Sequence, residues 1–200
     1  LYLNISNTKI STIDLSYYTQ LYTLKKIVCN NTPIKFLNLI NLEYLDISNT
    51  GIETINLSNN INLKQLYINN TNIVSLYLNK NINLTDIELK SNLLLTNVYI
   101  WQLPFPTIGT TIDTTNSPKV NFKLLKGLFF PDYNFNKYII SNFDKNDDGI
   151  IDTLEVNYIT KLNVDSLNIY DITGLEYLIN LEYLSCKNNL FNNINIKQNI

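Results

Sequence analysis

Apolar residues recur along most of the chain in a short, fixed pattern. In residues 41–52, Leu42, Leu45 and Ile47 alternate with polar or aromatic positions, and a short polar turn follows. Alternation with a period of two predicts a short β-strand whose apolar side chains point inward. The side chains expected to face solvent in this strand are Glu43, Tyr44, Asp46 and Ser48.

This segment returns at a constant interval. Residues 41–52 recur at 62–73 and, more loosely, at 83–94. Related copies begin near Leu3 and Leu24, and another pair appears around Leu162 and Leu184 at nearly the same step. The pattern L-x-x-L-x-L-x-x-(N/T)-x-I is that of a leucine-rich repeat. Because one copy cannot bury its apolar side alone, we predict an α/β solenoid: a parallel β-sheet horseshoe with repeats of about 21–22 residues.

Each repeat leaves its strand through a polar turn. Asn92 and Asn189 keep the Asn that is usual there, whereas Thr replaces it at Thr8, Thr32, Thr50 and Thr71. A side chain at this position can bond backbone groups that the turn leaves unpaired, and Thr does so less well. We therefore expect some irregular turns. We expect a hydrogen-bonded ladder along the stack, rather than a ligand site, from Asn7, Asn31, Asn49, Asn70 and Asn188.

The repeat stops between Leu103 and about Asn157. Pro104, Pro106 and a Thr-rich run predict extended or turning chain, with a possible edge strand at 119–122. We expect this segment to cap the first block. The aromatic residues expected to cover the open end of the core are Trp101, Phe105 and Phe122.

A short amphipathic helix is predicted next, followed by an acidic loop. Phe135, Tyr138, Ile139 and Phe143 fall at helical spacing, and Asp132 is the expected N-cap. Residues 144–155 then match a calcium loop of the EF-hand kind, which needs oxygen ligands at fixed positions and a Gly for the sharp turn. The matching residues are Asp144, Asn146, Asp148, Gly149, Ile150, Asp152 and Glu155. Oxygen donors alone favour calcium over zinc; the alternative is a solvated turn without an ion.

These segments give three parts. Residues 1–122 are the repeat block with its C-terminal cap, and residues 123–157 hold the helix, the calcium loop and a short helix. Residues 158–200 are a second, truncated repeat block. Since the chain has one such loop, we expect calcium to act as a structural clip that forms the N-cap of the second block. Ile151 is expected to anchor the loop in the core.

The amino-acid composition excludes some classes of function. Only 16% of residues are charged and the net charge is −2, which excludes a basic nucleic-acid binder. All 15 basic residues are Lys, and the chain has no His. It therefore lacks the commonest general base, and we do not expect an enzyme. The two cysteines, Cys29 and Cys186, occupy the same inward repeat position; a redox pair is the alternative to apolar filler.

Two further expectations concern the chain as a whole. No apolar run approaches the ~18 residues that a membrane helix needs. The sequence begins inside a patterned segment without an initiator Met, so we interpret it as a fragment or a processed form.

Nearly the whole chain resembles a known group of proteins, including the repeats of residues 41–103 and the segment 98–106. Residues 130–149, 159–164 and 172–184 are similar to bacterial cell-surface leucine-rich-repeat proteins that place an EF-hand-type loop ahead of internalin-like repeats. The resemblance implies an extracellular or cell-surface location. It also implies adhesion to, or recognition of, a protein or glycan. The alternative is a spacer or accessory region of a larger secreted or cell-wall-anchored enzyme.

The concave sheet face is where a solenoid usually binds its partner. Tyr44 and Tyr67 lie on neighbouring predicted strands, and exposed aromatic residues are enriched in interface hot spots. Strand propensity is the competing explanation for these tyrosines. The residues that we predict to contact a partner are Tyr44, Asp46, Gln65, Tyr67 and Glu88.

Overall fold

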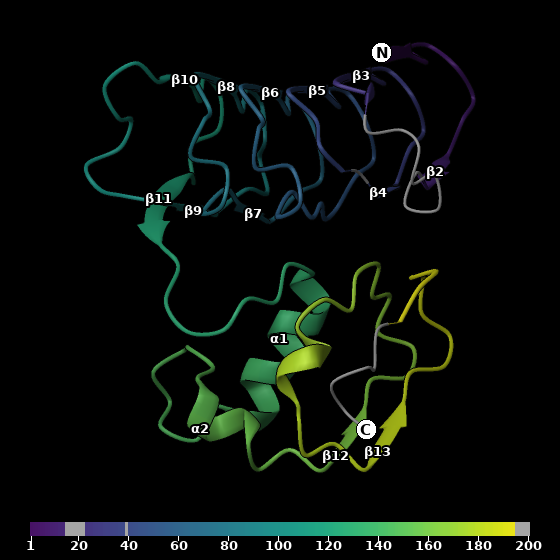
Figure 1. Ribbon diagram of the computed structural model, residues 1–200, viewed down its shortest axis with the longest axis vertical. Helices are drawn as coiled ribbons and strands as arrows, with labels where there is room; N and C mark the ends of the chain where they lie inside the picture. Colours follow the sequence, from purple (N-terminus) through teal and green to yellow (C-terminus); the bar gives the residue numbers. More distant parts are fainter. Residues whose placement is uncertain (15–22, 39, 195–200) are drawn as a thin grey trace. The chain divides into compact units, whose positions relative to one another are not determined.

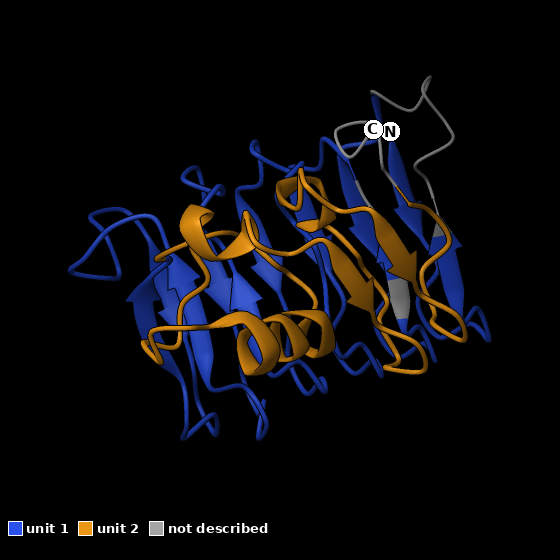
Figure 2. Ribbon diagram, turned by 90° about the horizontal axis from the view of Figure 1, so that it is seen from below, with its two compact units in different colours: residues 1–125 blue, residues 126–200 orange. Residues whose placement is uncertain are grey.

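The computed structural model describes residues 1–14, 23–38 and 40–194, which form two compact units, Leu1–Leu125 and Lys126–Ile200 (Figure 2). Unit 1 is a stack of short parallel strands in two rows (Figure 1). One row is a six-stranded sheet, here called the main sheet. In spatial order its strands are β1 (Tyr2–Asn4), β3 (Lys26–Val28), β5 (Tyr44–Asp46), β6 (Gln65–Tyr67), β8 (Asp86–Glu88) and β10 (Thr111–Asp113).

The apolar residues of the repeat form the core behind the main sheet. Ile27, Leu45, Leu66 and Ile87 occupy one register column of neighbouring strands and are fully buried. Each of these strands is very short, so one repeat contributes little core by itself. Stacking makes the column continuous, and the solenoid of parallel strands expected from the repeat is what the chain forms.

A second row of strands lies on the other side of this core (Figure 1). It contains a three-stranded sheet of β7 (Ser75–Tyr77), β9 (Asn97–Ile100) and β11 (Asn121–Leu124), and a pair formed by β2 (Thr12–Asp14) and β4 (Phe36–Asn38). Apart from the edge strand expected at 119–122, the sequence analysis did not predict this row. The sequence does contain a pattern for this row, which is a second alternation of apolar and polar residues within each repeat. Leu76 and Leu78 are buried, and so are Val98 and Ile100 one repeat later.

Three details of the prediction need correction. The main sheet does not end where the repeat pattern ends, because β10 pairs in register with β8 and adds a sixth strand. The chain from β8 to β10 is longer than that from β6 to β8, since the turns around Pro104 and Pro106 lengthen this repeat. The edge strand expected at 119–122 runs from Asn121 to Leu124. Ser48, expected to face solvent, is buried, and its hydroxyl is satisfied there by accepting from the Asn69 backbone N–H at 3.2 Å.

The turns are more regular than the Thr substitutions led us to expect. Asn31, Asn49 and Asn70, each just before a turn Thr, adopt left-handed backbone with φ of 54°, 55° and 52°. Asn tolerates this conformation, so it shapes the turn whatever residue follows. The expected Asn ladder is made mainly by backbone groups, although Asn70 Nδ2 also donates to Asn49 Oδ1 at 3.0 Å.

Unit 2 combines helices and two repeat strands around its own core. Its elements are α1 (Tyr133–Phe143), α2 (Thr153–Val156), β12 (Lys161–Asn163), the 3₁₀ turn η2 (Leu175–Tyr177) and β13 (Tyr183–Ser185). Asp132 caps α1 as expected, since its Oδ1 accepts from Phe135 N at 2.9 Å. Its Oδ2 accepts from Tyr170 N, which ties the helix to the repeats. Within the described ranges, no helix is both long and apolar enough to cross a membrane.

Candidate functional site

The outer side of the main sheet brings the predicted partner residues together. In the register of β5, β6 and β8, Tyr44 lies beside Gln65 and then Asp86. The adjacent row along the same strands is Asp46, Tyr67 and Glu88. All six side chains are half-buried, each shielded by its neighbours but open on its outer side. Because their backbones are hydrogen-bonded in parallel register over a fully buried core, the face is a rigid platform.

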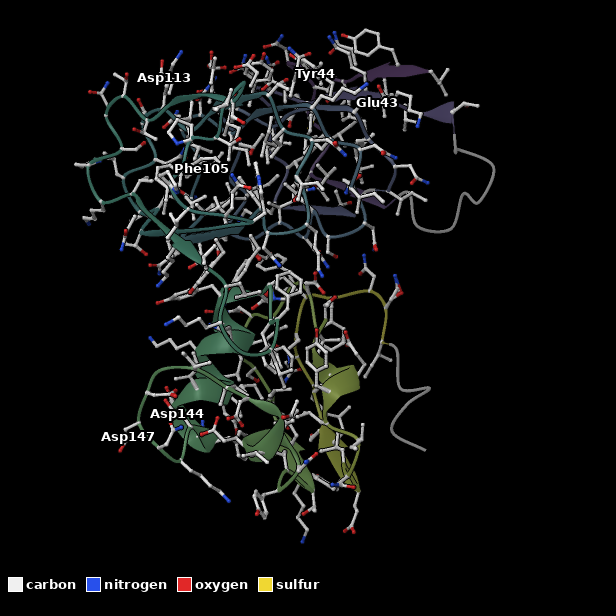
Figure 3. The ribbon with its side chains drawn as sticks, turned by 60° about the vertical axis from the view of Figure 1, so that its left-hand side comes forward. Glu43, Tyr44, Phe105, Asp113, Asp144 and Asp147 are labelled. Atoms are coloured by element: carbon white, nitrogen blue, oxygen red, sulfur yellow. The ribbon has the colours of Figure 1, made fainter. Side chains whose placement is uncertain are left out.

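Two tyrosines from neighbouring strands form an aromatic centre on this face. The ring centroids of Tyr44 and Tyr67 are 5.3 Å apart, and the ring planes are inclined by 38°. The ammonium of Lys26, on the next strand, lies 3.8 Å from the Tyr44 ring centroid, within the range of a cation–π interaction. Figure 3 labels Tyr44 on this outer surface of unit 1.

Carboxylates surround the aromatic centre. The hydroxyl of Tyr67 donates a hydrogen bond to Asp86 Oδ2. This bond, more than burial, raises the pKa of Tyr67, because losing the proton would place two negative charges together. Burial, together with the nearby charge of Asp46, raises the pKa of Tyr44. Both hydroxyls therefore remain protonated at neutral pH and are available as hydrogen-bond groups.

Charges along the face are arranged in two clusters. Toward β3, Glu43 pairs with Lys25 at 3.6 Å and with Lys64 at 2.9 Å. Toward β10, Lys90 bridges Glu88 at 3.1 Å and Asp113 at 3.2 Å. Together with Asp86 on β8, the second cluster has three carboxylates and one ammonium, so that end of the face is acidic.

Several charged residues of this face, among them Lys26, Asp86, Lys90 and Asp113, were absent from the predicted partner set. Lys26 on β3 and Asp86 on β8 lie in the same row as Tyr44 and Gln65, one strand further on either side. The pairing register of the strands is therefore enough to identify both residues. Lys90 follows β8, and Asp113 lies on β10. The sequence analysis placed Asp113 in a cap outside the sheet, and no repeat signal could have found it.

The acidic loop, residues 144–155, connects the two helices of unit 2. Its first residue, Asp144, ends α1, and its Oδ2 accepts from Gly149 N at 2.7 Å. Asn146 Oδ1 accepts from Asp148 N, and Asp148 Oδ1 accepts from Ile150 N, at 3.0 and 2.9 Å. These bonds fold the loop through tight Asx turns. Gly149, at φ 76°, takes the left-handed conformation that the sharp turn requires.

The end of the acidic loop is held by Glu155. Asp152 is the N-cap of α2, and Glu155 completes a capping box by accepting from Asp152 N at 3.1 Å. Its other oxygen accepts from Lys145 N at 2.8 Å, which joins the two ends of the loop. The Glu155 carboxylate is buried and held by two backbone donors.

The donor set suits a hard cation. Asp144 Oδ1 is enclosed and, among the described residues, has no hydrogen-bond partner. A buried carboxylate oxygen without a donor is costly, and a cation would satisfy it. In the part of the chain that the structure describes, however, no three acidic or cysteine side chains lie close enough together to hold a metal ion. The side-chain oxygens accept hydrogen bonds from the loop's own backbone. Figure 3 labels Asp144 and Asp147 in this part of unit 2.

The cysteines do not form a reactive site. Cys29 is fully buried, and burial raises the pKa of its thiol to about 12. Its Sγ lies 3.6 Å from the Asp46 carbonyl oxygen. Burial also raises the pKa of Cys186, which belongs to the other unit, and both thiols are free.

Comparison with known proteins supports the fold. No family model matches the chain, and no curated protein matches it. Among solved structures, it is similar to the functional domain of InlJ from Listeria monocytogenes, which is described as including a cysteine ladder. The TM-score is 0.52 and the sequence identity 18%; the match covers 99% of this chain and 37% of that one. InlJ is an internalin with leucine-rich repeats, and the likeness agrees with a leucine-rich-repeat solenoid fold for this chain.

Proposed function

We propose that this chain is a non-enzymatic recognition module that binds a protein partner through the main sheet face. The observation that carries the proposal is the contact of Tyr44 and Tyr67, at 5.3 Å, in the middle of a six-stranded platform. Aromatic side chains that are held rigidly give a large contact area at little entropic cost. The acidic cluster beside them gives the face a defined electrostatic preference.

The remaining chemistry favours binding over catalysis. The chain has no His, and the Cys29 thiol is protonated and buried at neutral pH. The Tyr67 hydroxyl is held protonated by its hydrogen bond to Asp86. None of these groups is an activated nucleophile or base of the usual kind. A surface or secreted location agrees with the internalin-type fold and with the residues that resemble bacterial surface proteins.

We also propose that the acidic loop binds one calcium ion with a structural role. The residues that would hold it are Asp144, Asn146, Asp148, Asp152 and Glu155 through their side chains and Ile150 through its carbonyl oxygen. The enclosed Asp144 Oδ1 supports this, and so does the array of oxygen donors at EF-hand spacing. Calcium would hold α1 and α2 at the two ends of the loop.

The calcium proposal is tested by thermal unfolding in millimolar calcium and in excess chelator. At a calcium concentration 100 times the dissociation constant, the folded state gains about 2.7 kcal/mol. Glu155→Gln is the informative variant, because it keeps the size of the side chain while it removes the charge and one of the two acceptor oxygens. We expect calcium to raise the midpoint of the wild type and to raise that of Glu155→Gln much less. No calcium-dependent rise at millimolar concentration would refute the calcium site.

The recognition proposal is tested by adhesion of beads that carry the chain to epithelial cells. We expect binding above that of beads carrying bovine serum albumin. It should fall when the cells are treated with protease and persist when they are treated with glycosidases. The reverse pattern would identify a glycan instead. Equal adhesion of both kinds of bead would contradict recognition and favour the alternative, a spacer region of a larger secreted or wall-anchored enzyme. The 37% coverage of InlJ is the observation behind that alternative.

A further inference from the structure

The first residues of unit 2 contact the acidic loop directly. We call residues 126–130, which lead from unit 1 into α1, the connector. Within it, Leu128 N donates a hydrogen bond to the Ile151 carbonyl oxygen at 2.8 Å. Gly127, at φ 75°, approaches the loop so closely that a Cβ atom there would collide with Ile150 Cγ2 and lie 2.5 Å from Ile151 O. The backbone of the connector therefore packs against the Ile150 side chain and the Ile151 carbonyl so closely that a methyl group on Gly127 does not fit.

The contacted residues are the ones that matter for a bound ion. Ile150 would supply its carbonyl oxygen as a ligand, and Ile151, only 3% exposed, anchors the loop in the core of unit 2. The other end of the loop is held by Glu155 through Lys145 N and Asp152 N. The middle of the loop contacts the connector. The position of Ile150 therefore depends on residues outside the loop of 144–155.

We infer that Gly127 and Leu128 are positioning residues for calcium in this loop, so that ion binding and attachment of the connector strengthen each other. This inference rests on the calcium binding proposed above. If the loop binds calcium more tightly when the connector is in place, then calcium must stabilise the attached connector by the same factor. The ion would thus fix the start of the chain that leads away from unit 2.

Calorimetric titration of calcium into the full chain is the first test. Gly127→Ala introduces a methyl group for which the structure leaves no space beside Ile150 and Ile151. Val164→Ala is the matched control, because Val164 is fully buried in the same unit on the repeat side. We expect Gly127→Ala to weaken calcium binding at least tenfold and Val164→Ala to change it less than twofold, although both lower thermal stability. Equal effects on affinity, or no effect of Gly127→Ala, would overturn the inference.

Trypsin cleavage of the wild type is the second test, and it does not depend on folding of a variant. Lys126 directly precedes Gly127, and a protease must bind residues on both sides of the bond it cuts, so attachment of Leu128 to the loop should slow cleavage after Lys126. At calcium concentrations ten times the dissociation constant, the initial rate there should fall about tenfold relative to chelator, as measured by mass spectrometry. Cleavage after the exposed Lys80 of unit 1 should not change.

The two tests separate this inference from the calcium site itself. If the titration of the wild type shows no heat of binding, both proposals fail. If calcium binds but cleavage after Lys126 proceeds at the same rate with and without it, the calcium site stands and the role of the connector is refuted.

Discussion

The Lys26 ammonium lies 3.8 Å from the centroid of the Tyr44 ring, directly across the pairing of β3 and β5. The ring face of a half-buried tyrosine on the main sheet is therefore already in contact with a cation. A basic side chain from a partner would use the same attraction, reinforced by the carboxylates of Asp46 and Asp86. The arrangement indicates that the aromatic centre accommodates positive charge better than negative charge.

The Lys26–Tyr44 contact also makes a modest contribution to stability. We expect Lys26→Ala to lower the free energy of unfolding of unit 1 by about 0.5–1 kcal/mol, the usual value of an exposed cation–π pair. Lys80→Ala, at an exposed position away from the main sheet, should change it by less than about 0.5 kcal/mol. Urea unfolding followed by circular dichroism measures both. If both variants lower the free energy of unfolding equally, the Lys26–Tyr44 contact does not contribute to stability.

Tyr67 should make unit 1 less stable in alkaline solution. Its pKa is raised in the folded state, chiefly by the hydrogen bond to Asp86, so the fold favours the protonated hydroxyl. This contribution is fully present below the ordinary tyrosine value near 10 and is lost as the pH rises above it. We expect Tyr67→Phe to flatten the fall in stability between about pH 10 and pH 12. A wild type and a variant that lose stability in parallel would contradict the role of this hydroxyl.

Asp113 should make unit 1 less stable in acidic solution. Hydrogen bonds from the Thr115 hydroxyl and backbone N–H, and then the contact with Lys90, lower the pKa of Asp113 to about 2. A lowered pKa means that the fold favours the ionised form. The contribution is present above the ordinary value of 3.8 and is lost as the pH falls toward 2. Asp113→Asn should lose less stability than the wild type over this interval, and an identical acid profile would refute the assignment.

Asn92 is the polar residue of unit 1 whose loss should cost most. Its side chain is fully buried; Oδ1 accepts from Thr71 N and Thr71 Oγ1, and Nδ2 donates to Ile68 O. Asn92→Ala leaves these groups buried without partners, so we expect a loss of about 2–4 kcal/mol. Asn83→Ala is the control, since Asn83 is exposed and makes one side-chain bond. Thermal unfolding should show a midpoint far lower for Asn92→Ala than for Asn83→Ala.

The repeat made the main sheet predictable from sequence. Leu45 and Leu66 hold the same position in consecutive copies and pair in the structure, because a fixed step places equivalent residues on neighbouring strands. The sixth strand, β10, escaped prediction because the segment around Pro104 breaks that step. The second row of strands also escaped, since such short strands give too brief an alternation to recognise beside the stronger one.

The candidate site was predictable to a similar degree. The repeat pattern placed Tyr44 and Tyr67 on adjacent predicted strands, and the structure brings their rings into contact. The sequence could not show that Lys26 covers Tyr44, because long side chains choose their partners only when the tertiary structure is formed. In the loop, spacing identifies the oxygen donors; the approach of Gly127 to Ile150 joins residues far apart in the sequence and has no local signal. Calcium binding stays a prediction until it is measured.

The most direct test of recognition by the main sheet compares bead adhesion of three proteins to the same cells. They are the wild type, the Tyr44→Ala/Tyr67→Ala double variant, and Tyr99→Ala, a control in the other row of strands of unit 1. The account predicts that the double variant loses at least tenfold in apparent affinity, as expected for interface hot spots, and that Tyr99→Ala keeps nearly all of it. Full adhesion of a folded double variant would contradict a partner site on this face.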